Sequence, residues 1–339
     1  MRNRIITAGI AALAVVALAG CNPQGGNSGA DSTEGGEAVA APDSVQLIAP
    51  ADPGGGWDQT ARALSEDLTA EGLVDSAPVS NIGGAGGTVG LASFANERDP
   101  FSLMVMGLVM VGAVETNSAE TRIEDTTPIA KLTEEPLVIV VPESSPYETL
   151  EDLVNDIDEN GQAVTITGGS AGGADHILAG LLLEAAGFDE AEITEKLNYV
   201  PNAGGGEAVS LLLGNNASAG ISGVGEFSQY VDSGDLRALA VSSAEPAALL
   251  PDAPTMVDEG YDVEYTNWRG VLAPGGISDA EAEALVNLVT ELHETEAWQT
   301  TLEEMGWTDA FQTGEEFATF LTENISSVQE TLKSIGLTQ

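Results

Sequence analysis

Cysteine is nearly absent from this chain of 339 residues, and basic residues are few. The single cysteine, Cys21, excludes an intrachain disulfide, so the fold must rest on its hydrophobic core. With one cysteine and two histidines far apart in the sequence, we expect neither a metal site nor another cofactor. Ten lysines and arginines stand against 54 acidic residues, for a formal net charge of −44. This charge argues against nucleic acid as a partner.

Lysine is the scarcest of the charged residues, with three in the chain. An acidic surface so poor in lysine predicts a halophilic protein that works at high salt, where charges are screened within a few Å. The alternative is an ordinary acidic secreted protein. If the ligand is an anion, attraction by the whole molecule cannot recruit it, so backbone dipoles must act locally.

The N-terminus has the pattern of an export signal. Arg2 and Arg4 precede an apolar stretch, 5–18, that is too short to span a bilayer as an ordinary helix. It ends in Leu-Ala-Gly-Cys, which resembles the bacterial lipobox. We therefore predict a lipoprotein signal peptide over 1–20 and a lipid on Cys21 that anchors an extracytoplasmic protein to the cell membrane. Residues 21–43 contain almost no large apolar residue and are expected to form a flexible tether.

Four glycine-rich loops share one setting, in which a short β-prone run precedes the loop and a helical pattern follows it. They read PGGGWD (53–58), GGAGGTVG (83–90), GGSAGG (168–173) and NAGGGE (202–207). The first turn of a helix has unpaired backbone donors and a partial positive charge, and such sites bind carboxylate as readily as phosphate. In open α/β sheets these loops lie where ligands bind. The four loops together predict an anion-binding cleft.

The remaining elements follow from periodicity and capping signals. Further strands are expected at Val45–Ala49, Pro78–Ile82, Leu103–Val111, Leu137–Val141, Val164–Thr167, Lys196–Val200, Ala217–Ser222, Leu236–Val241 and Trp268–Ala273. Leu103–Val111 is apolar throughout and is expected to be one strand buried on both faces. Asp58 is a candidate N-cap that could pair with Arg62. Capping boxes are expected at Thr149–Asp152, Ser278–Glu281 and Thr313–Glu316, and the tail after Pro274 is expected to be helical.

These elements indicate an α/β fold of two lobes. We expect the chain to cross from the first lobe to the second at Leu137–Pro142 and to return at Trp268–Ala273. The first lobe, 44–141 and 268–339, is then discontinuous, and the second lobe is 142–267. Such a body can close on a ligand by hinge bending.

Several stretches resemble the substrate-binding proteins of tripartite tricarboxylate transporters, the TctC or Bug family. They are PADPGGGWDQTARAL, NIGGAGGTVGLASFA, GGSAGGADHILAGLL, VPNAGGGEAVSLLLGN and PDAPTMVDEGYDVEYTNWRGVLAP. The likeness runs from about Val45 to the C-terminus. It departs at Gly84, where the family often has proline. The resemblance implies a two-lobe "Venus flytrap" fold of the periplasmic-binding type, without enzymatic activity. It also implies a monomer that binds a small di- or tricarboxylate and delivers it to a membrane permease.

In the family, backbone N–H groups of the first two glycine loops and ordered waters hold the ligand carboxylate. By resemblance the ligand-binding residues here are Gly54, Gly55, Gly56, Trp57, Asp58, Gly83, Gly84, Ala85, Gly86, Gly87, Ser170, Ala171, Gly172, His176, Asn202, Ala203 and Gly204. Arg269 could reach a ligand or brace the hinge.

Two other interpretations remain open. Gly168–Gly172 matches the G-x-S-x-G pattern of a serine hydrolase, but the sequence offers Ser170 only His176, six residues on, and His293 in a helical pattern. A receptor of the same fold could also serve another importer or a sensor. The glycine loops lack the G-x-G-x-x-G and Gly-Lys-Ser/Thr patterns of nucleotide sites.

Overall fold

The computed structural model describes residues 39–202 and 205–338, which belong to one compact unit. The predicted signal peptide, the lipid site at Cys21 and most of the tether lie outside the described residues, as do Ala203 and Gly204. Within the described part, no helix is long and apolar enough to cross a membrane.

Ten strands form a mixed sheet in the order β2-β1-β3-β9-β4-β7-β5-β6, with β10 and β8 also paired to β4. The strands of the first lobe are β1 (Gln46–Ala49), β2 (Val79–Asn81), β3 (Ser102–Gly107), β9 (Thr266–Ala273) and β10 (Thr308–Thr313). Those of the second lobe are β5 (Thr165–Gly168), β6 (Asn198–Pro201), β7 (Ala219–Gly223) and β8 (Leu236–Val241). The long strand β4 (Thr127–Pro142) belongs to both. Apart from the C-terminal part of Leu103–Val111, each expected strand coincides with an observed one, but Leu137–Val141 is only the end of β4, which begins at Thr127.

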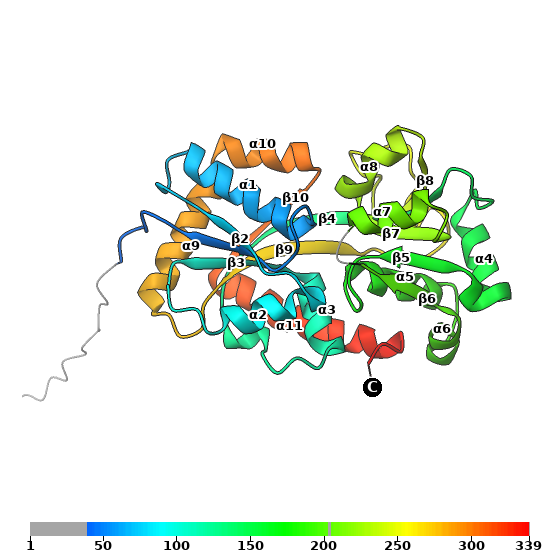
Figure 1. Cartoon of the computed structure of the whole chain (residues 1–339), viewed down its shortest axis with the longest axis horizontal. Helices are drawn as coiled ribbons and strands as arrows, with labels where there is room; N and C mark the ends of the chain where they lie inside the picture. The colour runs from blue at the N-terminus through cyan, green and yellow to red at the C-terminus, as the bar shows by residue number, and fades with distance from the viewer. Residues whose placement is uncertain (1–38, 203–204, 339) are drawn as a thin grey trace, which may run out of the picture. The chain divides into compact units, whose positions relative to one another are not determined.

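The strand β4 changes partners at Pro136. Residues 127–136 pair with β9, and residues 137–142 pair with β7 and β8. β9 begins at Thr266, opposite Pro136, and pairs on its other side with β3. Figure 1 shows β4 and β9 side by side between the two sets of elements. The backbone therefore crosses between the lobes at adjacent points in these two strands. Near the C-terminus Ile335 again lies against the second lobe, because a Cβ on Gly180 would lie 2.7 Å from its Cδ1.

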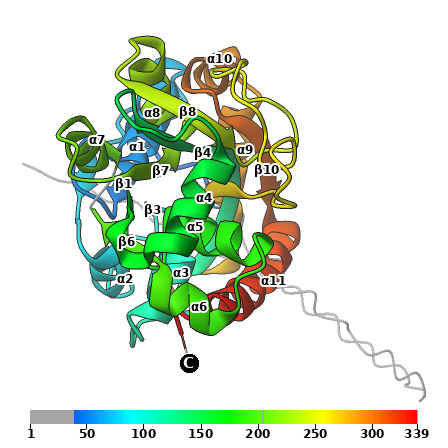
Figure 2. The same cartoon turned by 90° about the vertical axis from the view of Figure 1, so that its right-hand side faces the viewer.

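Helices cover both lobes. In the first lobe they are α1 (Gly56–Ala70), α2 (Thr88–Phe94), α3 (Leu108–Thr116), α9 (Asp279–His293), α10 (Glu296–Met305) and α11 (Gly314–Ser334). In the second they are α4 (Leu150–Asn160), α5 (Ala174–Ala185), α6 (Glu190–Lys196), α7 (Gly205–Leu213) and α8 (Val224–Asp232). Short 3₁₀ turns occur at η1 (Ala85–Gly87), η2 (Ile123–Asp125) and η3 (Gly161–Ala163). Figure 2 views the second lobe end-on, with α4 and α6 toward the viewer.

Leu103–Val111 is not one strand, and this prediction was wrong. β3 ends at Gly107 and α3 begins at Leu108. Both parts are buried, so an unbroken apolar run could not reveal where the strand stopped. The strand ends at a glycine that approaches β9 closely, because a Cβ on Gly107 would lie 2.3 Å from the Trp268 carbonyl oxygen. The result is a further strand-turn-helix unit.

Three predictions about helix ends and the tail also need correction. The N-cap of α1 is Gly55 and not Asp58, which lies within the first turn. The expected capping box at Thr313 does not form, because Thr313 is the last residue of β10 and its side chain makes no capping hydrogen bond. The tail is interrupted by β10, which pairs with β4. The boxes at Thr149 and Ser278 are confirmed.

Candidate functional site

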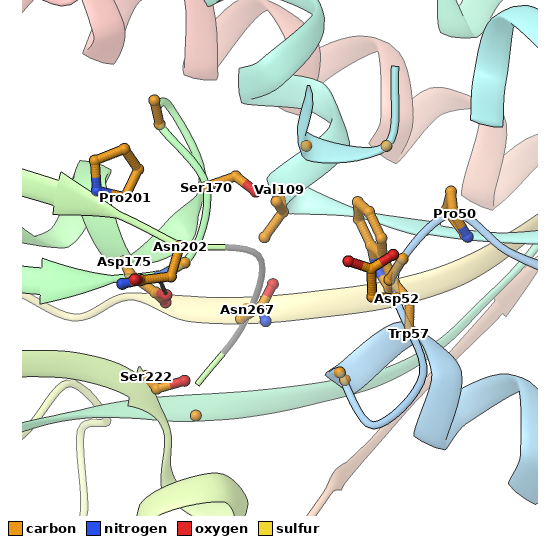
Figure 3. Close-up of a pocket in the computed structure, with 18 of the residues that line it drawn as sticks. Pro50, Asp52, Trp57, Val109, Ser170, Asp175, Pro201, Asn202, Ser222 and Asn267 are labelled. Atoms are coloured by element: carbon orange, nitrogen blue, oxygen red, sulfur yellow. Dashed lines mark hydrogen bonds between the residues drawn. The ribbon is translucent and has the colours of Figure 1, made fainter. Parts of the chain in front are cut away.

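A cavity of about 350 Å³ lies where the glycine loops of both lobes meet the strands β4 and β9. Its lining from the first lobe comprises Pro50, Ala51, Asp52, Gly55, Gly56, Trp57, Gly84, Ala85, Gly86, Gly87, Val109 and Asn117. The remaining lining residues are Glu135, Gly169, Ser170, Ala171, Asp175, Pro201, Asn202, Ser222, Gly223, Glu226, Asn267 and Arg269. Figure 3 shows Pro50, Asp52 and Trp57 on one side, Ser170, Asn202 and Asp175 on the other, and Asn267 between them.

The first glycine loop leads into the N-terminus of α1. The first backbone hydrogen bond of this helix runs from Gln59 N to Gly55 O. The amides of residues 56–58 therefore have no acceptor within the helix. Gly56 and Trp57 line the cavity, and the indole of Trp57 is buried. This end of the helix favours an anion.

Asp58 does not line the cavity, because its carboxylate is bound within the first lobe. It accepts hydrogen bonds from Gly54 N (2.8 Å) and Asn81 Nδ2 (2.8 Å), and it forms the expected i,i+4 ion pair with Arg62 (2.9 Å). Burial would raise the pKa of Asp58, but the hydrogen bonds from Arg62, Gly54 and Asn81 lower it below its ordinary value. Asp58 thus anchors the first glycine loop, and Gly54 also lies outside the lining.

The second glycine loop has a backbone that few residues other than glycine adopt. Gly84, Ala85, Gly86 and Gly87 all have positive φ, at 128°, 49°, 63° and 89°. A Cβ on Gly86 would lie 2.4 Å from the Cβ of Ala113, and one on Gly87 would lie 2.7 Å from the Trp57 ring. Asn117 Nδ2 donates to Ala85 O at 3.0 Å and holds the turn. All four residues line the cavity, whereas Gly83 does not.

The third glycine loop contributes Ser170 and Ala171 to the cavity, but His176 lies beside it. The Nδ1 of His176 accepts from Gly172 N at 3.1 Å, and its ring stacks on Tyr199 at a centroid distance of 4.1 Å. Burial lowers the pKa of His176 to about 4, so the ring is a neutral acceptor near pH 7. Among the described residues no hydrogen bond joins Ser170 to either histidine. The hydrolase interpretation therefore lacks its base.

The fourth loop reaches the cavity through Asn202. Its amide group is engaged with the preceding strands, since Nδ2 donates to Thr167 Oγ1 (2.7 Å) and Gly168 O (2.8 Å). Asn202 thereby joins the ends of β5 and β6.

Sequence reasoning missed most of the charged floor of the cavity, which we call the acidic base: Glu135, Asp175, Glu226 and Arg269. Arg269 lies on β9 and is 4% exposed; its Nη2 donates to Glu135 on β4, which is 3% exposed. The Arg269 guanidinium also lies over the Trp307 ring, 5.4 Å from the centroid. Arg269 was noted from its place at a lobe crossing. The acids sit in strands or helix starts among many others, and no sequence signal sets them apart.

Asp175 is the most perturbed acid of the base. Burial raises its pKa to about 7, against a hydrogen bond from Gly169 N, and the neighbouring Glu226 and Glu135 raise it further. Its carboxylate is therefore partly protonated near neutral pH. Among the described residues, no group of histidine, cysteine and acidic side chains is arranged to hold a metal ion.

Two α/β lobes joined by adjacent strands, with an interlobe cavity walled by glycine loops, define a two-lobe solute-binding protein. The comparisons with known proteins specify the family. The model of the tripartite tricarboxylate transporter family receptor, TctC, matches residues 60–337, and the chain belongs to this family. The family consists of periplasmic substrate receptors and not of enzymes, so the hydrolase alternative is excluded and the predicted fold class is confirmed.

Individual relatives are similar over most of the chain. The UPF0065 protein in the TAR-I ttuE-ttuC′ intergenic region of Agrobacterium vitis is 32% identical over 236 residues, which is 68% of this chain and 65% of that protein. Periplasmic binding protein BugD has a TM-score of 0.74 at 23% identity, with 87% of this chain and 98% of BugD covered.

Two solved structures carry a bound carboxylate. Rpa4515 of R. palustris with adipate has a TM-score of 0.78 at 19% identity, with 86% and 97% covered. MatC of Rhodopseudomonas palustris with malate has a TM-score of 0.74 at 21% identity, with 85% and 98% covered.

Proposed function

We propose that this protein captures a small di- or tricarboxylate in the interlobe cavity and delivers it to the permease of a tripartite tricarboxylate transporter. One observation carries the proposal: the cavity is lined by the start of α1, where the amides of residues 56–58 have no acceptor within the helix, and by the Gly84–Gly87 turn. Family membership and the adipate and malate in two similar structures support a carboxylate as the ligand.

In this proposal the ligand carboxylate binds amides of Gly56 and Trp57 and of Gly84–Gly86 from the first lobe, because the amides of Gly55 and Gly87 already donate to Asp52 O and Gly84 O. Ser170, Ala171 and Asn202 close the cavity from the second lobe, and the sequence-predicted Ala203 and Gly204 would extend that wall. Gly54, Asp58, Gly172 and His176 support the loops from behind through their hydrogen bonds, and Gly83 also lies outside the lining.

The lobes of the proposal are residues 44–141 with 268–339, and residues 142–267. The paired strands β4 and β9 would act as the hinge. A signal peptide over 1–20 and a tether over 21–43 would precede the lobes. A lipid on Cys21 would attach the protein, a monomer, to the cell membrane. The acidic surface would suit it to high salt.

Thermal unfolding in molar salt tests the proposal. The soluble part, residues 43–339, is heated with each of a panel of mono-, di- and tricarboxylates. A ligand at one hundred times its dissociation constant adds about 2.7 kcal/mol of stability. We expect at least one carboxylate to raise the midpoint. A folded protein that responds to none of them would contradict the proposal.

A further inference from the structure

The last helix of the chain, α11, reaches from one lobe to the other (Figure 1). Its body is fixed in the first lobe. Phe317 is fully buried and meets the ring of Trp268 on β9 edge to face, and Trp268 Nε1 donates to Asn324 Oδ1 at 3.0 Å. Its end lies against the second lobe, because a Cβ on Gly180 of α5 would lie 2.7 Å from Ile335 Cδ1. Ile335 is 1% exposed, so this contact is a packed one.

A second contact lies one residue further on. Gly336 has φ of 75° and turns the chain at the end of α11, where Leu337 N donates to Leu332 O at 2.7 Å, as in a Schellman motif. A Cβ on Gly336 would lie 2.1 Å from Thr194 Oγ1 of α6. We call residues 335–337 the C-terminal clasp. It contacts two helices of the second lobe, and it lies outside the cavity lining.

Gly180 provides the space in which the clasp packs. Glycine inside a helix is less favourable than alanine, because it has more conformational freedom to lose on folding. Gly180 nevertheless lies buried in the middle of α5. The Cβ of an alanine there would lie 2.7, 2.9 and 3.0 Å from three side-chain atoms of Ile335. The glycine therefore weakens α5 as a helix but admits Ile335.

The lobes are closed around the cavity in this structure. A Cβ on Gly112 of α3 would lie 1.9 Å from the carbonyl oxygen of Gly172 in the third glycine loop. A Cβ on Gly173 in the same loop would lie 3.1 Å from the Val109 side chain. These contacts join the first lobe to the second, and a hinge motion that opens the cavity would separate them. The contacts of the clasp thus belong to the closed arrangement.

We propose that the C-terminal clasp holds the two lobes closed and is released when the cavity opens. The helix α11 has 21 residues, and at about 1.5 Å per residue it forms a rod of about 30 Å. With its body fixed to the first lobe, this rod cannot follow the second lobe when that lobe turns about β4 and β9. The turn would carry α5 and α6 away from Ile335 and Gly336. The clasp therefore stabilises the closed state alone, and such a difference shifts the equilibrium between the two states.

The consequence is control of affinity from outside the cavity. A ligand that binds only the closed cavity binds more weakly to a protein that is closed for a smaller fraction of the time. The clasp would change that fraction without any contact with the ligand. This inference concerns the lobes themselves, so it does not depend on which ligand the cavity takes.

The test measures the separation of the lobes without ligand. The soluble part, residues 43–339, contains every described strand and helix and lacks Cys21, the only cysteine. Glu66→Cys on α1 and Ser210→Cys on α7 place one spin label on each lobe at exposed positions. Both helices begin beside a glycine loop of the cleft, so opening increases the distance between the labels. Double electron–electron resonance gives the distribution of this distance.

Two variants remove the clasp from the second lobe. Gly180→Ala keeps every atom of the clasp but fills its space on α5, and a chain that ends at Ser334 lacks the clasp. We expect the unaltered protein to show chiefly the short distance, and each variant to raise the share of a longer distance at least about fivefold. Ser326→Ala on the exposed face of α11 is the control, for which we expect no change.

Each outcome decides for or against the clasp. A folded Gly180→Ala protein with the same distribution as the unaltered protein overturns the proposal, and so does a folded truncated chain with that distribution. An unaltered protein that shows chiefly the longer distance also overturns it, because the clasp would then not hold the lobes closed. If the truncated chain does not fold, Gly180→Ala alone decides. No ligand enters the measurement, so its result leaves the proposed function untouched.

Discussion

The two ends of the cavity are built in different ways. The glycine loops act through the backbone: Gly84 to Gly87 have positive φ, and the start of α1 presents unpaired amides. The acidic base acts through buried side chains held by β4, β9 and the second-lobe helices. The first end of the cavity depends on glycines that have no Cβ, whereas the second end depends on charged side chains. Substitutions should therefore disturb the two ends differently.

The largest loss of stability and of ligand binding is expected from a substitution in the second glycine loop. Gly86→Ala puts a methyl group on a residue with φ of 63°, 2.4 Å from the Cβ of Ala113. The left-handed conformation and the clash together should cost about 3 kcal/mol of unfolding free energy and abolish carboxylate binding. Urea unfolding and calorimetry measure both. Wild-type stability and affinity would remove this turn from the account.

The side-chain end is tested by pH. The pKa of Asp175 is raised to about 7 in the folded protein, against about 4 in the unfolded chain. The raised pKa therefore adds to the unfolding free energy of the wild type in full below pH 4, and this contribution is lost as the pH rises toward 7. Asp175→Asn keeps an acceptor for Gly169 N without titrating, so its stability relative to wild type should rise by a few kcal/mol between pH 4 and 7.

Denaturant unfolding of both proteins across that pH range, in molar salt, gives the difference directly. Other titrating groups, including His176 with its lowered pKa, are common to both proteins and cancel. If the difference in unfolding free energy between the variant and the wild type stayed constant with pH, the pKa of Asp175 would not be raised in the folded protein.

The glycine loops and the acidic base meet at Gly56, where a substitution is expected to have a smaller effect on affinity and stability. A Cβ there would lie 2.6 Å from Arg269 Nη2, at the end of a long side chain. Gly56→Ala should displace the guanidinium from the helix start, lower ligand affinity by about tenfold and change stability by no more than about 1 kcal/mol. Equal affinity in the variant and the wild type, measured by calorimetry, would show that the position of Arg269 does not matter for binding.

The smallest effect is expected at Gly55, the matched control for Gly86. It has φ of −79°, and its Cβ would find only ordinary contacts, at 3.6 and 3.8 Å. Gly55→Ala should change stability by no more than about 0.5 kcal/mol, since a weaker N-cap is offset by a less flexible unfolded chain. A loss as large as that of Gly86→Ala would show that the contrast between the glycines is wrong.

The sequence predicted the strand-loop-helix units well, because glycine punctuation and apolar periodicity are local signals. It failed at Leu103–Val111, where burial on all sides removed the periodicity, and at β10, whose pairing with β4 joins residues far apart in the chain. The same limit applies to the site. The loops were visible as motifs, whereas the acidic base is assembled by tertiary contacts between β4, β9, α5 and α8. With 54 acidic residues in the chain, no local sequence pattern distinguishes the few that lie in the cavity.

The most direct test of the account is a crystal structure of the protein with its tightest carboxylate ligand. The account predicts that the ligand carboxylate lies within hydrogen-bond distance, about 2.7–3.2 Å, of backbone amides of Gly56, Trp57 and Gly84–Gly86, and that it makes no contact with Arg269. A carboxylate bound to the Arg269 guanidinium, or a ligand outside this cavity, would contradict it.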